Sequence, residues 1–177
     1  MEGRGGAIVL IGFMGAGKSS VGRVLERQTG LPRYDTDELI AGLAGTAITE
    51  IFDLRGEDEF RRLETAALTS VPHVDAIVVT GGGAILRAEN VALLRGLGTL
   101  VNLTADLETL FERVARRNTR PLLRSDDPRA TLCELLRVRE PLYRAAADFE
   151  IDTSALTHEE VASAIVSRLQ PVQQNAS

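Results

Sequence analysis

Eight consecutive residues near the start of the chain have the types and spacing of a phosphate-binding loop. Gly12-Phe13-Met14-Gly15-Ala16-Gly17-Lys18-Ser19 matches the pattern G-x-x-x-x-G-K-S/T, whose glycines let backbone N–H groups turn toward a polyphosphate. The lysine of such a loop bridges the β- and γ-phosphates, and the hydroxyl after it holds Mg²⁺. The residues that we expect to contact a nucleotide are Gly15, Ala16, Gly17, Lys18, Ser19 and Ser20, with Ser19 also at the metal.

The lysine of this loop is the only one in the chain, since every other basic side chain except the two histidines is an arginine. Arginine and lysine are not interchangeable, because a guanidinium is a planar fork and an ammonium is a compact point charge. Since the chain uses arginine everywhere else, we interpret Lys18 as a position that specifically requires an ammonium group. Survival of one lysine by chance is the alternative.

Two carboxylates two residues apart follow the first predicted helix. Asp35 and Asp37 flank Thr36 at the end of a short extended segment. One carboxylate of such a pair can face Mg²⁺ while the other accepts a proton from an attacking hydroxyl. The alternative is an N-capping Asp or Thr before an acidic first helical turn. Beside a phosphate-binding loop, the pair favours catalysis.

Three consecutive glycines, Gly81–Gly83, follow the apolar run at 76–79 and Thr80. Glycine costs about 0.5–1 kcal/mol relative to alanine inside a helix or strand, so regular structure does not explain the run. We expect the backbone to approach a ligand closely here. A plain flexible turn is the alternative.

Several arginines could deliver cations to the same cleft. Arg61 lies among glutamates on a predicted helix, where surface ion pairing is the alternative. Arg120 lies in the polar stretch 116–129, whose composition suits a mobile lid. Arg139 lies close to Pro141, where we expect a helix break. Together they favour an anionic substrate, and a carboxylate fits the guanidinium fork.

Other proteins with phosphate-binding loops fit the sequence less well. Asp53-Leu54-Arg55-Gly56 has the D-x-x-G spelling of a GTPase switch, but we expect it in a turn between helices. A guanine-reading N-K-x-D motif cannot occur, because the only lysine is already used. No predicted strand ends in adjacent acidic residues, as a motor ATPase would require. The residues therefore predict an Mg-ATP-dependent kinase of a small hydroxylated anion.

Short apolar runs alternate with helical patterns along the chain. Apolar runs predict strands, and spacings of three and four predict helices. The predicted strands are 7–11, 76–79, 99–103 and 149–152, and the predicted helices are 18–29, 57–70, 89–96, 106–117, 129–146 and one from Thr157. The alternation predicts a three-layer α/β domain over 1–177 with a mostly parallel sheet and ligands at the strands' carboxyl ends. We expect a lid at about 116–129 and a weakly ordered tail at 171–177.

The amino-acid composition excludes further classes of protein. A chain of 177 residues with 44% hydrophobic and 25% charged residues is ordinary for a globular domain. A net charge of −5 argues against a nucleic-acid or anionic-membrane binder, and a lone Cys133 excludes an intramolecular disulfide. We expect a cytoplasmic monomer with no nucleic-acid or membrane partner. His73 and His158 are expected at the surface, without a catalytic part.

Six motifs in this order resemble shikimate kinase. They span about Ile8 to Asp152 and are the loop at 12–19, Asp35-Thr36-Asp37, the segment 56–64, Gly81-Gly82-Gly83, Arg120-Pro121-Leu122-Leu123 and Arg139-Glu140-Pro141-Leu142-Tyr143. The resemblance implies a fold like that of nucleoside monophosphate kinases, with a five-stranded parallel sheet, a substrate-binding subdomain and a lid. It also implies phosphorylation of the shikimate 3-hydroxyl by ATP with Mg²⁺, in the pathway to chorismate and aromatic amino acids.

On the nucleotide side, the resemblance implies that Lys18 and Ser19 serve ATP and Mg²⁺, with Asp35 reaching the metal through water. Arg113 would pack on the adenine. Arg120, on the lid, would contact ATP and stabilise the transferring phosphoryl group, and so would be catalytic together with Lys18 and Asp37.

On the acceptor side, the resemblance implies that Asp37 holds the attacking hydroxyl and is the base. Arg61 and Arg139 would take the shikimate carboxylate. The remaining substrate contacts would be the backbone of Gly81, Gly82 and Gly83 and the walls Phe52 and Phe60.

One feature departs from the family pattern. Family members often carry an Arg or Pro near the adenine in the loop after the final strand, where this chain has Ser154-Ala155-Leu156-Thr157-His158. Two alternatives to a shikimate kinase stay open. One is a kinase of a related small hydroxy acid, of the gluconate type, and the other is a non-catalytic protein with the same fold.

Overall fold

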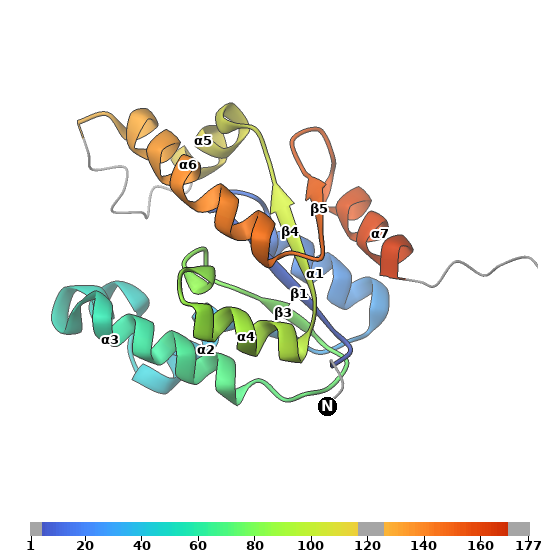
Figure 1. Cartoon of the computed structure of the whole chain (residues 1–177), viewed down its shortest axis with the longest axis horizontal. Coiled ribbons are helices and arrows are strands. Elements are labelled where there is room, and N and C mark those ends of the chain that lie inside the picture. Colours follow the sequence, from blue (N-terminus) through green and yellow to red (C-terminus); the bar gives the residue numbers. More distant parts are fainter. Residues whose placement is uncertain (1–4, 117–125, 170–177) are drawn as a thin grey trace, which may run out of the picture.

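A five-stranded, all-parallel sheet forms the centre of the computed structural model, which describes residues 5–116 and 126–169 (Figure 1). Its strand order is β2-β3-β1-β4-β5. The strands are β1 (Ala7–Gly12), β2 (Arg33–Asp35), β3 (Ile77–Val79), β4 (Gly98–Thr104) and β5 (Phe149–Asp152). The predicted α/β fold with a parallel sheet is therefore confirmed.

Helices cover both faces of the sheet. They are α1 (Lys18–Thr29), α2 (Thr36–Ala44), α3 (Ile48–Ser70), α4 (Ala88–Leu97), α5 (Leu107–Ala115), α6 (Pro128–Ala146) and α7 (His158–Leu169), with a short 3-10 turn η1 (Ala84–Leu86). Helices α1 and α7 pack together on one face, and α4 and α6 lie over β4 on the other (Figure 1). The two-sided cover explains why β1 is buried along its whole length and reads as a continuous apolar run.

The register of the sheet aligns the ends of three neighbouring strands. Leu10 of β1 pairs with Val79 of β3, and Val79 pairs with Asp35 of β2. The Thr80 hydroxyl then donates to the carbonyl of Leu10 at 2.9 Å. Because parallel strands end at the same edge, this register brings the loops after β1, β2 and β3 to one place.

Two separate hydrophobic clusters hold the molecule together. The larger one surrounds the sheet and includes buried residues of all five strands except β2. The smaller one lies between α2 and α3, and its buried members are Ile40, Ile51, Phe60, Leu63 and Ala67. We call the unit formed by α2 and α3 the acceptor subdomain. Within the described residues, no helix combines the length and apolar character needed to cross a membrane.

The predicted elements differ from the structure in the acceptor subdomain and in α6. Helix α2 and the first half of α3 were not predicted, although Gly56 (φ 80°, ψ 174°) does separate two helical segments as expected. The helix break expected near Pro141 is wrong, because α6 continues through it. Proline removes one helical hydrogen bond, but Leu132 before it and Tyr143 after it are both buried and hold the helix in place.

Candidate active site

The phosphate-binding loop lies between β1 and α1, at the carboxyl edge of the sheet. Gly17 is the N-cap of α1, and its carbonyl accepts the first helical hydrogen bond from Val21 at 2.9 Å. Ala16 is fully buried, whereas Ser19 and Ser20 are partly exposed in the first turn of α1. The positive end of the α1 dipole is therefore directed at this loop, as anion binding requires.

The ammonium of Lys18 lies inside the loop. Its Nζ donates to the carbonyl of Gly12 at 2.7 Å and to that of Phe13 at 3.0 Å, and the residue is only 9% exposed. A buried cation is costly unless negative groups compensate it. A polyphosphate placed in the loop would provide that compensation.

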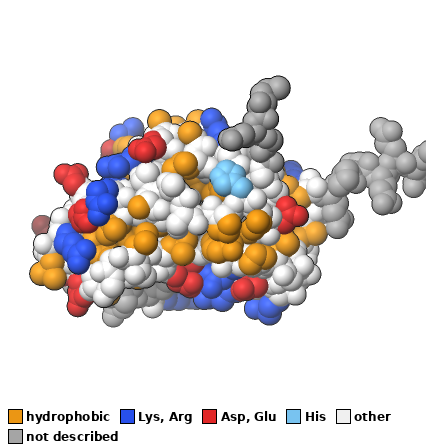
Figure 2. Space-filling view, turned by 90° about the horizontal axis from the view of Figure 1, so that it is seen from below, with side chains coloured by type: hydrophobic (Ala, Val, Ile, Leu, Met, Phe, Trp, Pro, Cys, Tyr) orange, Lys and Arg blue, Asp and Glu red, His pale blue; other side chains and the backbone are white. Residues whose placement is uncertain are grey.

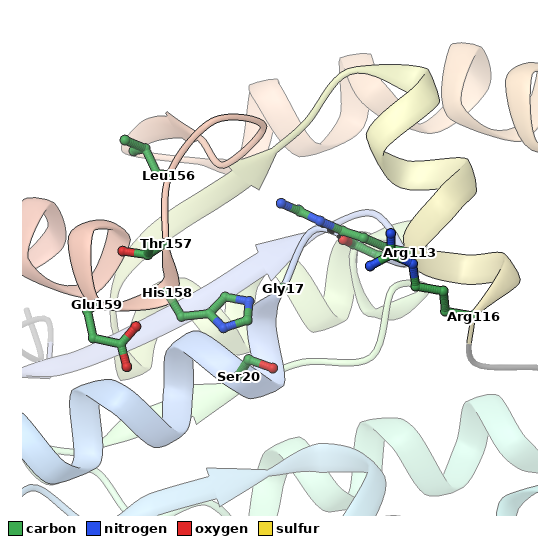
Figure 3. A pocket seen from close by; sticks show the side chains of 9 residues that line it. Gly17, Ser20, Arg113, Arg116, Leu156, Thr157, His158 and Glu159 are labelled. Carbon is green, nitrogen blue, oxygen red and sulfur yellow. Dashed lines mark hydrogen bonds between the residues drawn. The ribbon is translucent and has the colours of Figure 1, made fainter.

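Beside the loop is a cavity of about 570 Å³ (Figure 3). Figure 3 shows Arg113 and His158 pointing into it from opposite sides, with Gly17 and Ser20 at the start of α1 between them. The residues that line it are Gly15, Gly17, Ser20, Arg113, Arg116, Leu156, Thr157, His158 and Glu159. The cavity adjoins the phosphate loop, so a nucleotide with its phosphates in the loop could place its base and ribose here.

Arg113 is held in place at this cavity. Its guanidinium donates to the carbonyl of Gly15 at 3.3 Å, to the Thr153 hydroxyl at 2.9 Å and to the Thr153 carbonyl at 2.8 Å. Thr153 is buried and its hydroxyl also contacts the carbonyl of Ala16 at 3.1 Å. Arg113 therefore ties the loop after β5 to the phosphate loop, and it presents a planar cation to the cavity.

Sequence reasoning missed two contributions to this side of the site. His158 is exposed, as expected, but it also lines the cavity, as does Leu156. Thr157 and Glu160 form a capping box at the start of α7, where a helix was predicted: the Glu160 N–H donates to the Thr157 hydroxyl at 3.2 Å, and the Thr157 N–H to the Glu160 carboxylate at 2.8 Å. The signal that could have found Leu156 and His158 is their place in the loop after the final strand, where family members often carry a residue near the adenine.

The acceptor side of the site is organised around Gly81–Gly83. A Cβ added to Gly81 would lie 3.0 Å from a carboxylate oxygen of Asp37, and one added to Gly83 would lie 2.2 Å from the Arg61 guanidinium. A Cβ on Gly82 would lie 3.7 Å from the backbone nitrogen of Met14, in the phosphate loop. Because these glycines have no side chains, the Asp37 carboxylate, the Arg61 guanidinium and the backbone of the phosphate loop can all approach the same short segment. The glycine loop thus joins the acceptor side to the nucleotide side.

Arg61 pairs with two glutamates and still faces the glycine loop. Its guanidinium lies 3.0 Å from Glu57 and 3.1 Å from Glu64, and the carbon of the guanidinium lies 5.4 Å from the centre of the Phe60 ring. Glu64 is fully buried, and one of its carboxylate oxygens has no hydrogen-bond partner in the part of the chain that the structure describes. Burial raises the pKa of Glu64 above its usual 4.5, and nearby Asp37 adds to this, although Arg61 opposes it. Sequence reasoning did not single out Glu64.

Arg139 differs from the other arginines of α6. Arg137 and Arg144 are exposed and pair with Glu134 at 2.7 Å and Glu140 at 2.9 Å. Basic and acidic side chains also lie next to one another on the opposite face of the molecule, seen from below in Figure 2. Arg139 is partly buried and forms no hydrogen bond or ion pair with any residue in 5–116 or 126–169. A partly desolvated guanidinium without such a partner favours an anionic ligand.

Asp35 caps helix α2, so the capping alternative considered for this motif is confirmed. Its carboxylate accepts a hydrogen bond from the Asp37 N–H at 3.0 Å and lies 3.5 Å from the Arg33 guanidinium. Burial nevertheless raises the pKa of the Asp35 carboxyl above its usual 3.8. The cap also fixes Asp37 in the first turn of α2, where its side chain reaches the glycine loop.

The two aromatic residues expected to wall the pocket lie against each other. The ring centres of Phe52 and Phe60 are 4.5 Å apart, with Phe60 buried and Phe52 40% exposed. Arg120 and residues 117–125 of the expected lid lie outside the described residues, as does the tail at 171–177.

Comparisons with known proteins agree with this geometry. A family model described as "Shikimate kinase" matches residues 14–170. The chain belongs to the shikimate kinase family. It is 45% identical over 157 residues to a shikimate kinase of Neisseria meningitidis, a match that covers 87% of this chain and 91% of the relative. Members of the family are ATP-dependent phosphotransferases, so the predicted enzyme class and use of ATP are confirmed.

The fold agrees with solved shikimate kinase structures as well. The shikimate kinase of Acinetobacter baumannii, solved in complex with shikimate, superposes with a TM-score of 0.86 at 36% identity, covering 95% of this chain and 94% of that one. A gluconokinase of Sinorhizobium meliloti superposes with a TM-score of 0.59 at 20% identity. The second likeness shows a shared fold and carries no inference about substrate.

Proposed function

We propose that this protein transfers the γ-phosphoryl group of ATP to the 3-hydroxyl of shikimate, giving shikimate 3-phosphate and ADP. One observation supports this most strongly. Gly82 lies against the phosphate loop while its neighbours Gly81 and Gly83 lie against Asp37 and Arg61. A carboxylate that can accept a proton and a cation that can bind an acid therefore lie beside the glycine loop that borders the phosphate-binding loop.

Each residue of the acceptor side has a part in the proposed reaction. Asp37 orients the attacking hydroxyl and takes its proton as the bond to phosphorus forms. Arg61 and Arg139 bind the substrate carboxylate, which fixes the ring and directs one hydroxyl at the phosphate. Phe52 and Phe60 supply apolar contact to the carbon ring. The backbone of Gly81–Gly83 borders the substrate where a side chain would displace it.

On the donor side, Lys18 holds the β- and γ-phosphates and stabilises the charge that develops during transfer. Arg113 and His158 enclose the base, and Ser20 borders the same cavity. Arg120 is expected to stabilise the transferring group, and it lies outside the described residues.

The residues present fit a magnesium ion. Ser19 and Asp35 offer a hydroxyl and a carboxylate, the oxygen ligands that Mg²⁺ takes alongside water and phosphate. The Asp35 side chain is only 11% exposed and lies 3.5 Å from the Arg33 guanidinium, yet burial still raises its pKa, so a second cation beside it would favour the ionised carboxylate. When bound, Mg²⁺ would neutralise charge on the phosphates. We propose Ser19 and Asp35 as its protein ligands, with Asp35 acting through water.

We propose that the protein acts as a monomer. We also propose that it works in the cytoplasm, where Mg-ATP is available. Neither point is needed for the reaction itself.

A coupled assay of ADP release from Mg-ATP, with shikimate present or absent, tests the reaction. Asp37→Asn should retain ATP binding and lose about 10²–10⁴-fold in kcat, the usual contribution of a general base. Asp58→Asn is the matched control, since Asp58 is exposed on α3. Turnover of gluconate instead of shikimate would support the related hydroxy-acid kinase. Ligand binding by calorimetry without turnover would support a non-catalytic protein.

A further inference from the structure

We infer that Tyr143 is a positioning residue of the acceptor site: its hydroxyl anchors the Gly81–Gly83 loop and fixes α6, which carries Arg139, against that loop. This inference rests on the proposed function only for its effect on the substrate. The anchor itself is a property of the fold.

Tyr143 makes a contact far along the chain. The residue is 2% exposed, and its hydroxyl donates to the carbonyl of Gly82, which is 61 residues earlier in the sequence. A Cβ added to Gly82 would lie 3.6 Å from the hydroxyl oxygen, so the phenol occupies the space beside the glycine. Buried tyrosine hydroxyls need a hydrogen-bond partner, and here that partner belongs to the substrate site.

The glycine loop depends on anchors supplied by other elements. Its residues have no side chains to pack, and glycine has more backbone freedom than any other residue. Side chains of two other elements hydrogen-bond to it: the Thr36 hydroxyl accepts from the Gly81 N–H at 3.0 Å, and Tyr143 donates to Gly82. Thr36 ties the loop to α2, beside Asp37. Tyr143 ties it to α6.

The second anchor also sets the position of Arg139. Arg139 and Tyr143 are four residues apart on α6 and therefore lie on the same face of the helix. Pro141 between them has no N–H and removes one internal hydrogen bond of the helix. The direction of this part of α6 must then come from tertiary contacts. The bond from Tyr143 to Gly82 is such a contact, and it links the carboxylate-binding arginine to the loop beside the attacking hydroxyl.

The anchor can be tested by comparing Tyr143→Phe, which removes the hydroxyl and keeps the ring, with Tyr34→Phe. Tyr34 is the only other tyrosine and lies on β2, outside the site. We expect Tyr143→Phe to raise the KM for shikimate roughly 3- to 10-fold, the loss of one neutral hydrogen bond, with the KM for ATP unchanged. Tyr34→Phe should change neither constant. An equal rise in both constants, or no rise for shikimate, would overturn the inference.

Amide hydrogen exchange gives a readout that does not require turnover. In Tyr143→Phe, exchange should become faster in the peptide that covers 81–86 and stay unchanged in β1 and α1. If the wild-type protein failed to phosphorylate shikimate, the proposed function would be wrong, yet this exchange pattern would still support the anchor. Unchanged exchange at 81–86 would refute the anchor whatever the enzyme's substrate.

Discussion

The nucleotide side and the acceptor side of the site are built in different ways. On the nucleotide side, the phosphate-binding part comes from one stretch, the phosphate loop and first turn of α1, which is embedded in the large cluster around the sheet, while α5 and residues 156–159 line the cavity beside it. The acceptor side is assembled from four segments, around Asp37, Arg61, Gly82 and Arg139. Two of these segments belong to the acceptor subdomain, whose own buried cluster has only five members. The phosphate loop is therefore held by the large cluster, whereas the positions of Asp37 and Arg61 depend on a small cluster of their own.

Among the tests of this contrast, breaking the phosphate loop should have the largest effect. Lys18→Ala removes the ammonium that lies inside the phosphate loop, so both ATP binding and the rate should fall, with kcat/KM for ATP lower by about 10²–10³-fold.

Arg139→Ala tests the acceptor side, and it should raise the KM for shikimate and leave ATP binding intact. Steady-state kinetics with each substrate varied in turn measures both. A loss of ATP affinity in Arg139→Ala would contradict the separation into two sides.

The small cluster of the acceptor subdomain offers a test of its separate packing. Ile51 is fully buried there, and Ile51→Ala should destabilise the subdomain by about 2–5 kcal/mol, the usual cost of such a cavity. Amide exchange should become faster in 36–70 and change little in β1 and β4. Ile165→Ala, in the large cluster, is the control and should affect the sheet. Uniform acceleration in Ile51→Ala would show that the molecule has a single cooperative core.

The same contrast explains what the sequence could predict. The phosphate loop, α1 and the capping box of α7 depend on residues within a few positions of one another, so spacing alone locates them. Helix α2 is not predicted, because it is only nine residues long and contains a glycine, and because its first residues, Thr36 and Asp37, belong to the carboxylate motif that we interpreted as catalytic. Contacts such as Tyr143 with Gly82 or Thr153 with Ala16 join residues far apart, and no periodicity encodes them.

Arg61 and Arg139 show the limit for the site itself. Both were candidates for binding an anion, but their role at the substrate carboxylate came from the resemblance, and their neighbours in sequence do not distinguish them from the exposed arginines beside them. What distinguishes them is burial and partners: Arg61 lies over Gly83, and Arg139 forms no ion pair in the described part of the chain. The burial and the partners of the two arginines depend on where α3 and α6 meet the glycine loop, which is a property of the tertiary fold.

A smaller effect should appear in the pH dependence of stability. The carboxyl of Glu64 has a pKa raised above 4.5 by burial, so the folded protein holds this proton more tightly than the unfolded chain does. The free energy of unfolding therefore falls as pH rises from about 4.5 through the folded pKa. Glu64→Gln lacks this titration. In urea unfolding at a series of pH values, wild type should lose stability relative to Glu64→Gln across this window. A relative gain would mean that attraction to Arg61 outweighs burial.

The smallest effect would sharpen the comparison by tightening the acceptor subdomain. Gly42 lies inside α2, and a Cβ added there would meet no atom within 4 Å, so Gly42→Ala should stabilise α2 by about 0.5–1 kcal/mol. Gly45, at the end of the same helix, has equal space but a φ of +66°. Gly45→Ala should therefore destabilise by about 1–2 kcal/mol. Thermal unfolding would measure the overall change, and amide exchange in 36–44 would place it. The two substitutions should change stability in opposite directions, because both sites have open space and only Gly45 has a positive φ. Stabilisation by both would mean that backbone conformation does not limit the end of this helix.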